Sequence, residues 1–233
     1  MFTSIKELLT KVGPKLSQQQ LLNAQAVMNY MRVGRWVTEN DFVLQSRVPK
    51  RHNVWDVVLE EVRDARILYL EFGVASGHSI RYWSERLLNP EAKLHGFDSF
   101  EGLPEEGGPW KRGQFDTGGR VPHITDQRVE FFKGWFQETL PDYSFPPHEI
   151  LVVNMDADLY SSTAFVLNHI REHIVPGTFI YFDEMNHVEH EPLAFSHFLD
   201  ETSLAFELVA ADRTLAHMAF KCVKDGERLA KSR

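Results

Sequence analysis

The hydrophobic pattern of the chain changes character near residue 65. Before that point apolar residues recur every three or four positions, as in Leu21, Leu22, Ala26 and Val33, which predicts amphipathic helices. Gly34 is expected to interrupt the first of them, and a second helix is predicted over 54–62. We expect residues 1–65 to form a helical extension or lid that belongs to the same domain as the rest.

Beyond residue 65, short apolar runs alternate with helical or loop segments. These runs cover 67–72, 94–97, 129–132, 150–155 and 178–182, and most of them end at a glycine or an acidic residue. A short, continuous apolar run is typical of a strand that is buried on both faces of a parallel sheet. The alternation with helices therefore predicts a doubly wound α/β fold.

The last two apolar runs, 206–211 and 215–223, are separated by only 212–214. Parallel strands cannot be joined by so short a connection, so an antiparallel hairpin at the sheet edge is predicted. A mostly parallel, seven-stranded sheet that ends in such a hairpin is the Rossmann-like architecture of class I methyltransferases. We assign it to residues 66–233.

Composition narrows the class of protein. With 233 residues, 43% hydrophobic and 25% charged, the chain fits one globular domain. Its net charge of -8 argues against nucleic-acid binding, which needs clustered basic residues. The single cysteine, Cys222, excludes an intrachain disulfide. No signal-like N-terminus and no apolar run of about 20 residues is present, so we expect a cytoplasmic protein without a membrane partner.

Acidic residues stand at or just beyond the ends of the predicted strands. They are Glu71, Asp98, Asp156, Asp158, Asp183 and Glu184. In open α/β sheets, ligands bind beyond the carboxyl ends of the strands. Carboxylates that converge there are costly unless something cationic binds among them. The pattern therefore predicts a site for a positively charged ligand.

The segment EFGVASGHS, residues 71–79, predicts a glycine loop between a strand and a helix. Its glycine spacing departs from the G-x-G-x-x-G of dinucleotide-binding proteins. A carboxylate at Glu71 suits the positive amino and sulfonium groups of S-adenosylmethionine better than a pyrophosphate. The alternative is a generic strand-to-helix turn. The predicted cofactor contacts in this loop are Glu71, Gly73, Val74, Ser76, Gly77 and Ser79.

Two further segments are candidates for the nucleoside part of the cofactor. Asp98, followed by Ser99, ends the next strand and can accept hydrogen bonds from both ribose hydroxyls. The alternative for Asp98 is a solvated loop residue or a helix cap. Gly134, Trp135 and Phe136 follow the third strand, where a purine could lie against an aromatic edge. Core packing is the alternative for these two aromatic residues.

Asp156 and Asp183 each stand at the end of a predicted strand. The two residues are 27 positions apart, which is the length of one βαβ crossover. Their carboxyl groups can therefore be neighbours, and oxygen ligands of this kind suit Mg²⁺. Asp158 is then free to act as a base. We interpret His187 as facing the substrate. Alternatively, one or two of these acids cap the helices that follow.

These motifs together resemble those of the macrocin O-methyltransferase family. The matching strings are EFGV (71–74), DSFEGLP (98–104), TLP (139–141), DADLYSST (156–163) and DE (183–184). The resemblance runs from about Leu70 to His187 and implies a class I fold and S-adenosylmethionine as methyl donor. It also implies Mg²⁺ or another divalent cation, and acceptors that are sugar hydroxyls of antibiotics.

Carried over by position, the resemblance assigns the metal to Asp156, Asp183 and Glu184, and the general base to Asp158. Asp156 is also expected to touch the cofactor and Tyr160 the substrate. The family has two aspartates where this chain has Asp183 and Glu184, and the N-terminal region matches poorly, so the identity of the acceptor does not transfer. The resemblance and the amphipathic N-terminal helices are both compatible with a homo-oligomer.

The sequence thus predicts an S-adenosylmethionine- and Mg²⁺-dependent O-methyltransferase acting on a hydroxyl of a small molecule, such as a sugar or natural-product glycoside. Two alternatives stay open. One is a metal-independent methyltransferase that acts on nitrogen or a carboxyl group. The other is a non-catalytic module that binds S-adenosylmethionine. A hydride-transferring dehydrogenase is disfavoured by the glycine spacing and by Glu71.

Overall fold

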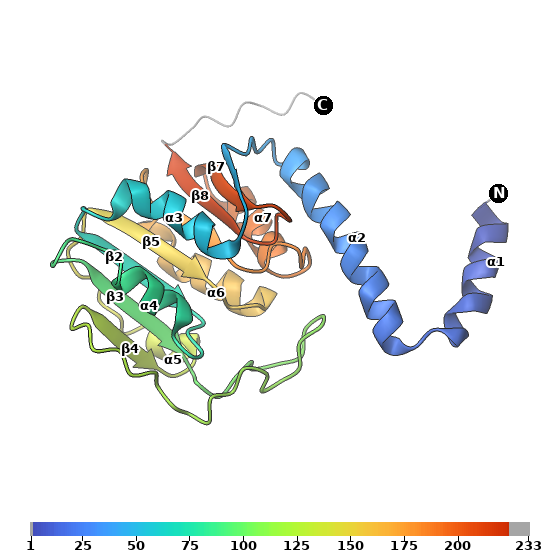
Figure 1. The fold of residues 1–233 in the computed structure, drawn as a ribbon, viewed down its shortest axis with the longest axis horizontal. Coiled ribbons are helices and arrows are strands. Elements are labelled where there is room, and N and C mark those ends of the chain that lie inside the picture. The colour runs from blue at the N-terminus through green and yellow to red at the C-terminus, as the bar shows by residue number, and fades with distance from the viewer. Residues whose placement is uncertain (1, 224–233) are drawn as a thin grey trace.

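The apolar runs form a mixed sheet in the computed structural model, which describes residues 2–223. Its strands are β1 (Ser46–Val48), β2 (Ile67–Phe72), β3 (Lys93–Asp98), β4 (Val129–Lys133), β5 (Ile150–Met155), β6 (Phe179–Phe182), β7 (Ala205–Asp212) and β8 (Met218–Val223). They are ordered β1-β7-β8-β6-β5-β2-β3-β4 (Figure 1). Residues 224–233 of the predicted domain lie outside the described residues.

The predicted parallel sheet with a terminal hairpin is confirmed. Strand β8 runs antiparallel to β6 and β7, while the other neighbouring pairs are parallel. The sheet has eight strands instead of the seven we expected. The additional strand, β1, pairs with β7 and therefore covers the edge that the hairpin was predicted to form. Three residues in a segment interpreted as helical carry too little pattern to be recognised.

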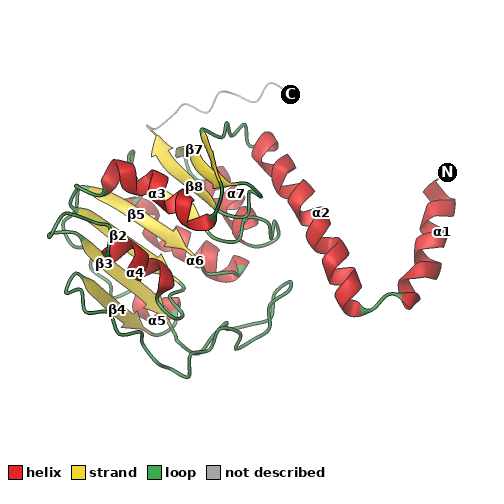
Figure 2. Cartoon of the chain, in the orientation of Figure 1, coloured by secondary structure: helices red, strands yellow, loops and turns green. Residues whose placement is uncertain are grey.

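Helices flank both faces of the sheet (Figure 2). They are α1 (Phe2–Val12), α2 (Gln18–Glu39), α3 (Arg51–Val62), α4 (His78–Ser84), α5 (Phe136–Thr139), α6 (Tyr160–Ile170) and α7 (Glu191–Glu201), with short 3₁₀ turns at Gly13–Lys15 and Arg171–His173. Buried side chains of α3 and α4 share one hydrophobic cluster with one face of the sheet. Those of α6 and α7 share a second cluster with the opposite face.

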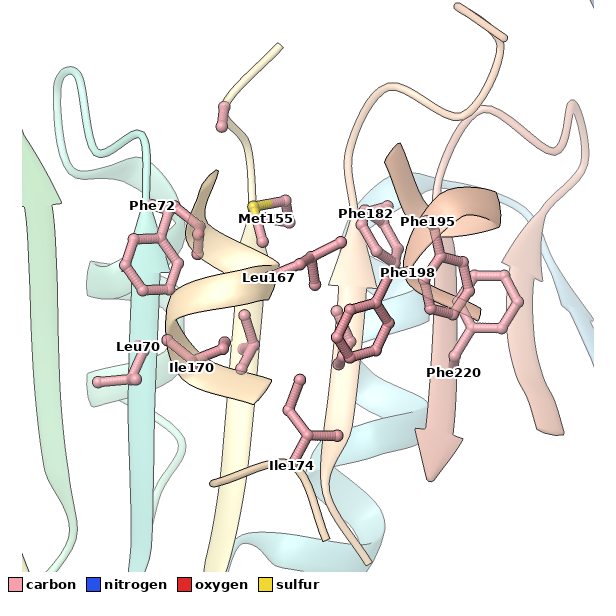
Figure 3. Close-up of a cluster of buried hydrophobic side chains, with 14 of the residues drawn as sticks. Leu70, Phe72, Met155, Leu167, Ile170, Ile174, Phe182, Phe195, Phe198 and Phe220 are labelled. Carbon is pink, nitrogen blue, oxygen red and sulfur yellow. The ribbon is translucent and has the colours of Figure 1, made fainter. Parts of the chain in front are cut away.

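The period of two in each strand sends alternate side chains to the two clusters. In β2, Leu70 and Phe72 face α6, whereas Tyr69 faces α4. Figure 3 shows Leu167 and Ile170 of α6 lying over Leu70, Phe72 and Met155, beside an aromatic group made of Phe182, Phe195, Phe198 and Phe220. Because a slip by one residue would exchange the two faces, this packing fixes the register of the strands and so the positions of their ends.

The N-terminal helices are confirmed, but the expected interruption at Gly34 is wrong. Helix α2 begins at a capping box formed by Ser17 and Gln20 and continues through Gly34 to Glu39. One interior glycine costs a helix only about 1 kcal/mol, and Val33 beside it is fully buried against the core. Helix α1 and the start of α2 extend away from the sheet (Figure 1). Within residues 2–223, no helix has both the length and the apolar character to cross a bilayer.

Candidate active site

A pocket opens at the carboxyl ends of the parallel strands. The register aligns Phe72 of β2 with Phe97 of β3 and with Met155 of β5, and aligns Met155 with Phe182 of β6. The residues that follow these positions are therefore neighbours in space. The predicted site residues that line this pocket are Gly73, Asp98, Ser99, Gly134, Trp135, Phe136, Asp156, Asp158, Asp183 and Glu184.

The glycine loop comes very close to the strand beside it. Gly73 has a φ of +95°, and a Cβ atom there would lie 1.8 Å from the carbonyl oxygen of Asp156. Only glycine fits such an approach, which brings the end of β2 against the residue that follows β5. Of the predicted loop contacts, only Gly73 lines the pocket, together with Ala75, which was not predicted.

Glu71 is not among the residues that line the pocket. The residue is fully buried, and its carboxylate accepts hydrogen bonds from Tyr69 Oη and Ser79 Oγ, both at 2.6 Å. Burial raises the pKa of Glu71 to about 8, although the hydrogen bonds from Ser79 and Tyr69 oppose the shift. In this arrangement Glu71 joins β2 to the first turn of α4, and direct contact with a cofactor stays a prediction, as it does for Val74, Ser76, Gly77 and Ser79.

Asp98 lines the pocket, but main-chain groups already use its carboxylate. Oδ2 accepts hydrogen bonds from the backbone N–H groups of Val74 and Ala75, both at 2.8 Å, and Oδ1 accepts one from Phe100 at 2.6 Å. Asp98 therefore clamps the glycine loop to the end of β3. Oδ2 already accepts two hydrogen bonds, whereas Oδ1 has a second lone pair with which it could accept a hydrogen bond from a ribose hydroxyl.

The segment 134–136 both lines the pocket and packs against the core, the two alternatives that the sequence left open for its aromatic residues. Gly134, Trp135 and Phe136 all line the pocket. Phe136 also packs edge-on against Phe72, with ring centroids 5.6 Å apart, and is partly buried against the core. Core packing therefore holds for Phe136, while both aromatic side chains stay available as an apolar wall of the pocket.

The acidic residues that follow β5 and β6 meet in the same pocket. Burial and the neighbouring Asp183 raise the pKa of Asp158 to about 7. Burial, Asp183 and Asp158 raise the pKa of Glu184 to about 8. The pKa of Asp156 is also raised, by burial and then by the charges of Asp183 and Asp158. These carboxylates thus share a poorly hydrated space in which their negative charges repel one another.

The backbone of Asp158 has an unusual conformation. Its φ of +58° lies in the left-handed region, which aspartate adopts more readily than most residues but still at some cost. Such strain is found preferentially at functional sites. The conformation supports a functional role for Asp158 independently of its pKa.

Asp183 differs from its acidic neighbours because it is surrounded by donors. Tyr181 Oη donates to Oδ1 at 2.5 Å, and Arg51 Nη1 lies 3.1 Å from Oδ2. His217 Nδ1, from the β7–β8 hairpin, lies 2.7 Å from the Asp183 carbonyl oxygen and 3.4 Å from Oδ1. Burial would raise the pKa of Asp183, but His217 and Arg51 outweigh it and hold the pKa below its ordinary value.

The chemistry of this donor set fits a hard divalent cation, since Asp156, Asp183 and Glu184 all bring carboxylate oxygens to one pocket. Their arrangement is not a closed metal cage. Within residues 2–223, no three His, Cys, Asp or Glu side chains stand in a geometry that could hold an ion. Asp183 pairs with Arg51 instead. The metal assignment therefore stays a prediction.

Tyr160 and His187 lie outside this pocket. Tyr160 Oη is 2.8 Å from His197 Nδ1. His187 Nε2 is 3.5 Å from Glu184 Oε2, and its ring packs against Trp110 at 4.5 Å. His187 lines a second, smaller pocket that lies between the 187–190 segment and helix α2. The predicted roles of both residues in substrate binding stay predictions.

Sequence reasoning missed Arg51 and His217. Arg51 lies in the first turn of α3, where the helix dipole opposes a cation, but the sequence predicted that helix only from residue 54, so this signal was missed. His217 has no such signal, since only the fold brings the hairpin to Asp183. Arg51 lines the pocket, and the remaining unpredicted lining residues are Ala75, Gly102, Leu103, Pro104, Gln114, Phe115, Gln137, Ala157 and Ser162.

The fold is that of class I methyltransferases. A calicheamicin methyltransferase of known structure superposes with a TM-score of 0.56 at 22% identity, over 88% of this chain and 93% of that chain. Residues 119–219 match the macrocin O-methyltransferase (TylF) family. The resemblance to that family predicted from the sequence is thereby confirmed.

Two curated relatives match part of the chain. The mycinamicin III 3''-O-methyltransferase of Micromonospora griseorubida is 31% identical, over 42% of this chain and 35% of the relative. The 8-demethyl-8-(2,3-dimethoxy-alpha-L-rhamnosyl)-tetracenomycin-C 4'-O-methyltransferase of Streptomyces olivaceus is 31% identical, over 37% of this chain and 40% of the relative. The match thus spans 35% of the length of the first relative and 40% of the second, less than half of each.

Proposed function

We propose that this protein is an S-adenosylmethionine-dependent O-methyltransferase that methylates a hydroxyl group of a sugar or glycoside with the help of a divalent cation. One observation carries the proposal. A single pocket at the carboxyl ends of the strands joins the glycine-loop wall to a set of partly unpaired carboxylates. The family match and the sugar-directed names of the two relatives support the same conclusion.

The two sides of the pocket have different tasks. Gly73, Asp98 and Trp135 would hold the nucleoside cofactor, since they offer a close backbone approach, hydroxyl acceptors and an apolar wall. Asp156, Asp183 and Glu184 would hold the cation once their carboxylates, which do not form a closed cage in this structure, draw together around it. When bound, the cofactor supplies an electrophilic methyl group on a sulfonium, and the cation makes the acceptor hydroxyl more acidic.

Asp158 is the proposed general base. A base is most effective when its pKa lies near the working pH, and the pKa of Asp158 is raised to about 7 by burial and by Asp183. Its carboxylate would accept the hydroxyl proton as the oxygen attacks the methyl carbon in line with the sulfonium. Orientation of the two reactants in a pocket that excludes water would supply most of the rate gain.

A metal-independent methyltransferase is the second candidate, because Arg51 already provides a positive charge at Asp183. The experiment that separates the two is a methyl-transfer assay with S-adenosylmethionine and a panel of rhamnosides, other glycosides and catechols, followed by mass spectrometry with and without EDTA. We expect transfer to a glycoside that EDTA abolishes and Mg²⁺ restores. Transfer that EDTA leaves unchanged would favour the second candidate. Cofactor binding without transfer to any acceptor would contradict both.

A further inference from the structure

Arg51 is the only basic residue among those that line the pocket of the described structure. It lies in the first turn of α3, where the helix dipole disfavours a cation. The guanidinium is held there by two contacts. It pairs with the carboxylate of Asp183. It also lies over the ring of Trp55, one turn further along the same helix, where the guanidinium carbon (Cζ) of Arg51 is 5.3 Å from the ring centroid.

The pairing leaves one side of Asp183 open to exchange. Tyr181 and His217 both approach Oδ1, whereas the nearer contact of Arg51 is with Oδ2, at 3.1 Å compared with 3.4 Å to Oδ1. The Asp183 side chain is 6% exposed and that of Arg51 is 38% exposed. Arg51 can therefore leave toward solvent while Tyr181 and His217 keep the carboxylate in place.

We propose that Arg51 is an exchangeable internal counter-cation, which occupies Asp183 until a divalent cation displaces it. The inference rests on the proposed function, because it takes Asp183 as a ligand of that cation. A guanidinium and a dication that share one carboxylate would repel each other strongly in a poorly hydrated pocket. Arg51 thus weakens metal binding in the empty enzyme and compensates the buried carboxylate when the metal is absent.

The direct test measures Mn²⁺ binding without any acceptor, using the electron paramagnetic resonance signal of free Mn²⁺. The variants are Arg51→Gln and, as a matched control, Arg63→Gln, which removes one exposed positive charge at the other end of the same helix. We expect Arg51→Gln to bind Mn²⁺ about tenfold more tightly than wild type, since one close repulsion is lost. Arg63→Gln should match wild type.

A second variant and a second measurement guard against misfolding. Arg51→Lys keeps the charge but loses the planar fork that matches a carboxylate, so its Mn²⁺ affinity should fall between those of wild type and Arg51→Gln. In EDTA, Arg51→Gln should melt at a lower temperature than wild type, and Mn²⁺ should raise its melting temperature by more than it raises that of wild type.

Equal Mn²⁺ affinity of wild type and Arg51→Gln would contradict the proposal that Arg51 and the cation compete for Asp183. It would not contradict the proposed metal-dependent function. An equal gain in Arg63→Gln would also overturn the competition, because the effect would then come from net charge. If neither wild type nor Arg51→Gln binds Mn²⁺, both the competition and the metal requirement fail, while methyl transfer itself can still be tested in EDTA.

Discussion

Asp98 and Asp156 each mark the carboxyl end of a buried strand of one sheet, and both line the same pocket, yet their surroundings differ. Three backbone N–H groups donate to the carboxylate of Asp98. The strongest influences on Asp156, after burial, are the charges of Asp183 and Asp158. The first carboxylate is compensated by the chain itself. The second belongs to a group that is compensated only in part, by Arg51 and His217 at Asp183, and is therefore poised to receive a cation.

The largest effect should come from Asp156→Ala, which removes a proposed metal ligand from the uncompensated group. We expect kcat/KM to fall by roughly 10³-fold, in line with the loss of one main electrostatic contact in a transition state. Affinity for S-adenosylhomocysteine, measured by calorimetry, should change little. Asp142→Ala, at an exposed position, is the control. A normal methylation rate in Asp156→Ala would remove the basis for the metal role.

Asp158→Asn should lower kcat by roughly 10²- to 10⁴-fold, the usual contribution of a general base. The wild-type rate should rise with pH through about 7, because Asp158 must lose its proton before it can accept one. The residual rate of Asp158→Asn should lack this rise. A pH profile that is the same in both proteins would assign the base to another group.

Loss of the charge should destabilise the protein at Asp98 but not at Asp158. Asp98→Asn replaces one acceptor by a donor that faces backbone N–H groups, and we expect a loss of about 1–3 kcal/mol in the free energy of unfolding. Asp158→Asn removes one charge from a repelling group and should leave stability unchanged or raise it. Urea unfolding in EDTA would measure both. Destabilisation of equal size in the two variants would erase the distinction between Asp98 and the acidic group.

The smallest effect should be a dependence of stability on pH. The folded-state pKa values of Asp158 and Glu184, about 7 and 8, lie above their ordinary values of 3.8 and 4.5. The folded state therefore binds more protons than the unfolded state between these limits, so stability is lost as pH rises through 7 to 8. In EDTA the melting temperature should fall from pH 5.5 to 8.5, by about 2–4 °C for each kcal/mol lost.

Two comparisons check this pH dependence. A protein that carries both Asp158→Asn and Glu184→Gln should show a flatter profile, and Mg²⁺ should restore stability mainly at the higher pH. A melting temperature of the wild type that rises over this range would contradict the assigned shifts.

The sequence was sufficient for seven of the eight strands and for the ends of the parallel ones, because long apolar runs and the residue that follows each run are local properties, but it missed the short strand β1. Glu71 shows what the local sequence pattern could not predict, which is the direction in which a side chain faces. Its position after the apolar stretch of β2 was recognised, but whether its side chain faces the pocket or the interior depends on the register and on Tyr69 and Ser79. The contacts of Arg51 and His217 with Asp183 join segments 132 and 34 residues away, and no local pattern contains them.

Strand β1 has a consequence for self-association. It covers the backbone groups at the carboxyl end of the apolar strand β7, at residues 210–212, which would otherwise offer a template for another chain. At the opposite edge, β4 exposes the charged side chains of Glu130 and Lys133, which discourage strand pairing. A short edge strand at one margin and charged side chains at the other both disfavour growth into a larger sheet. If copies of this protein associate, we expect them to meet through helical surfaces.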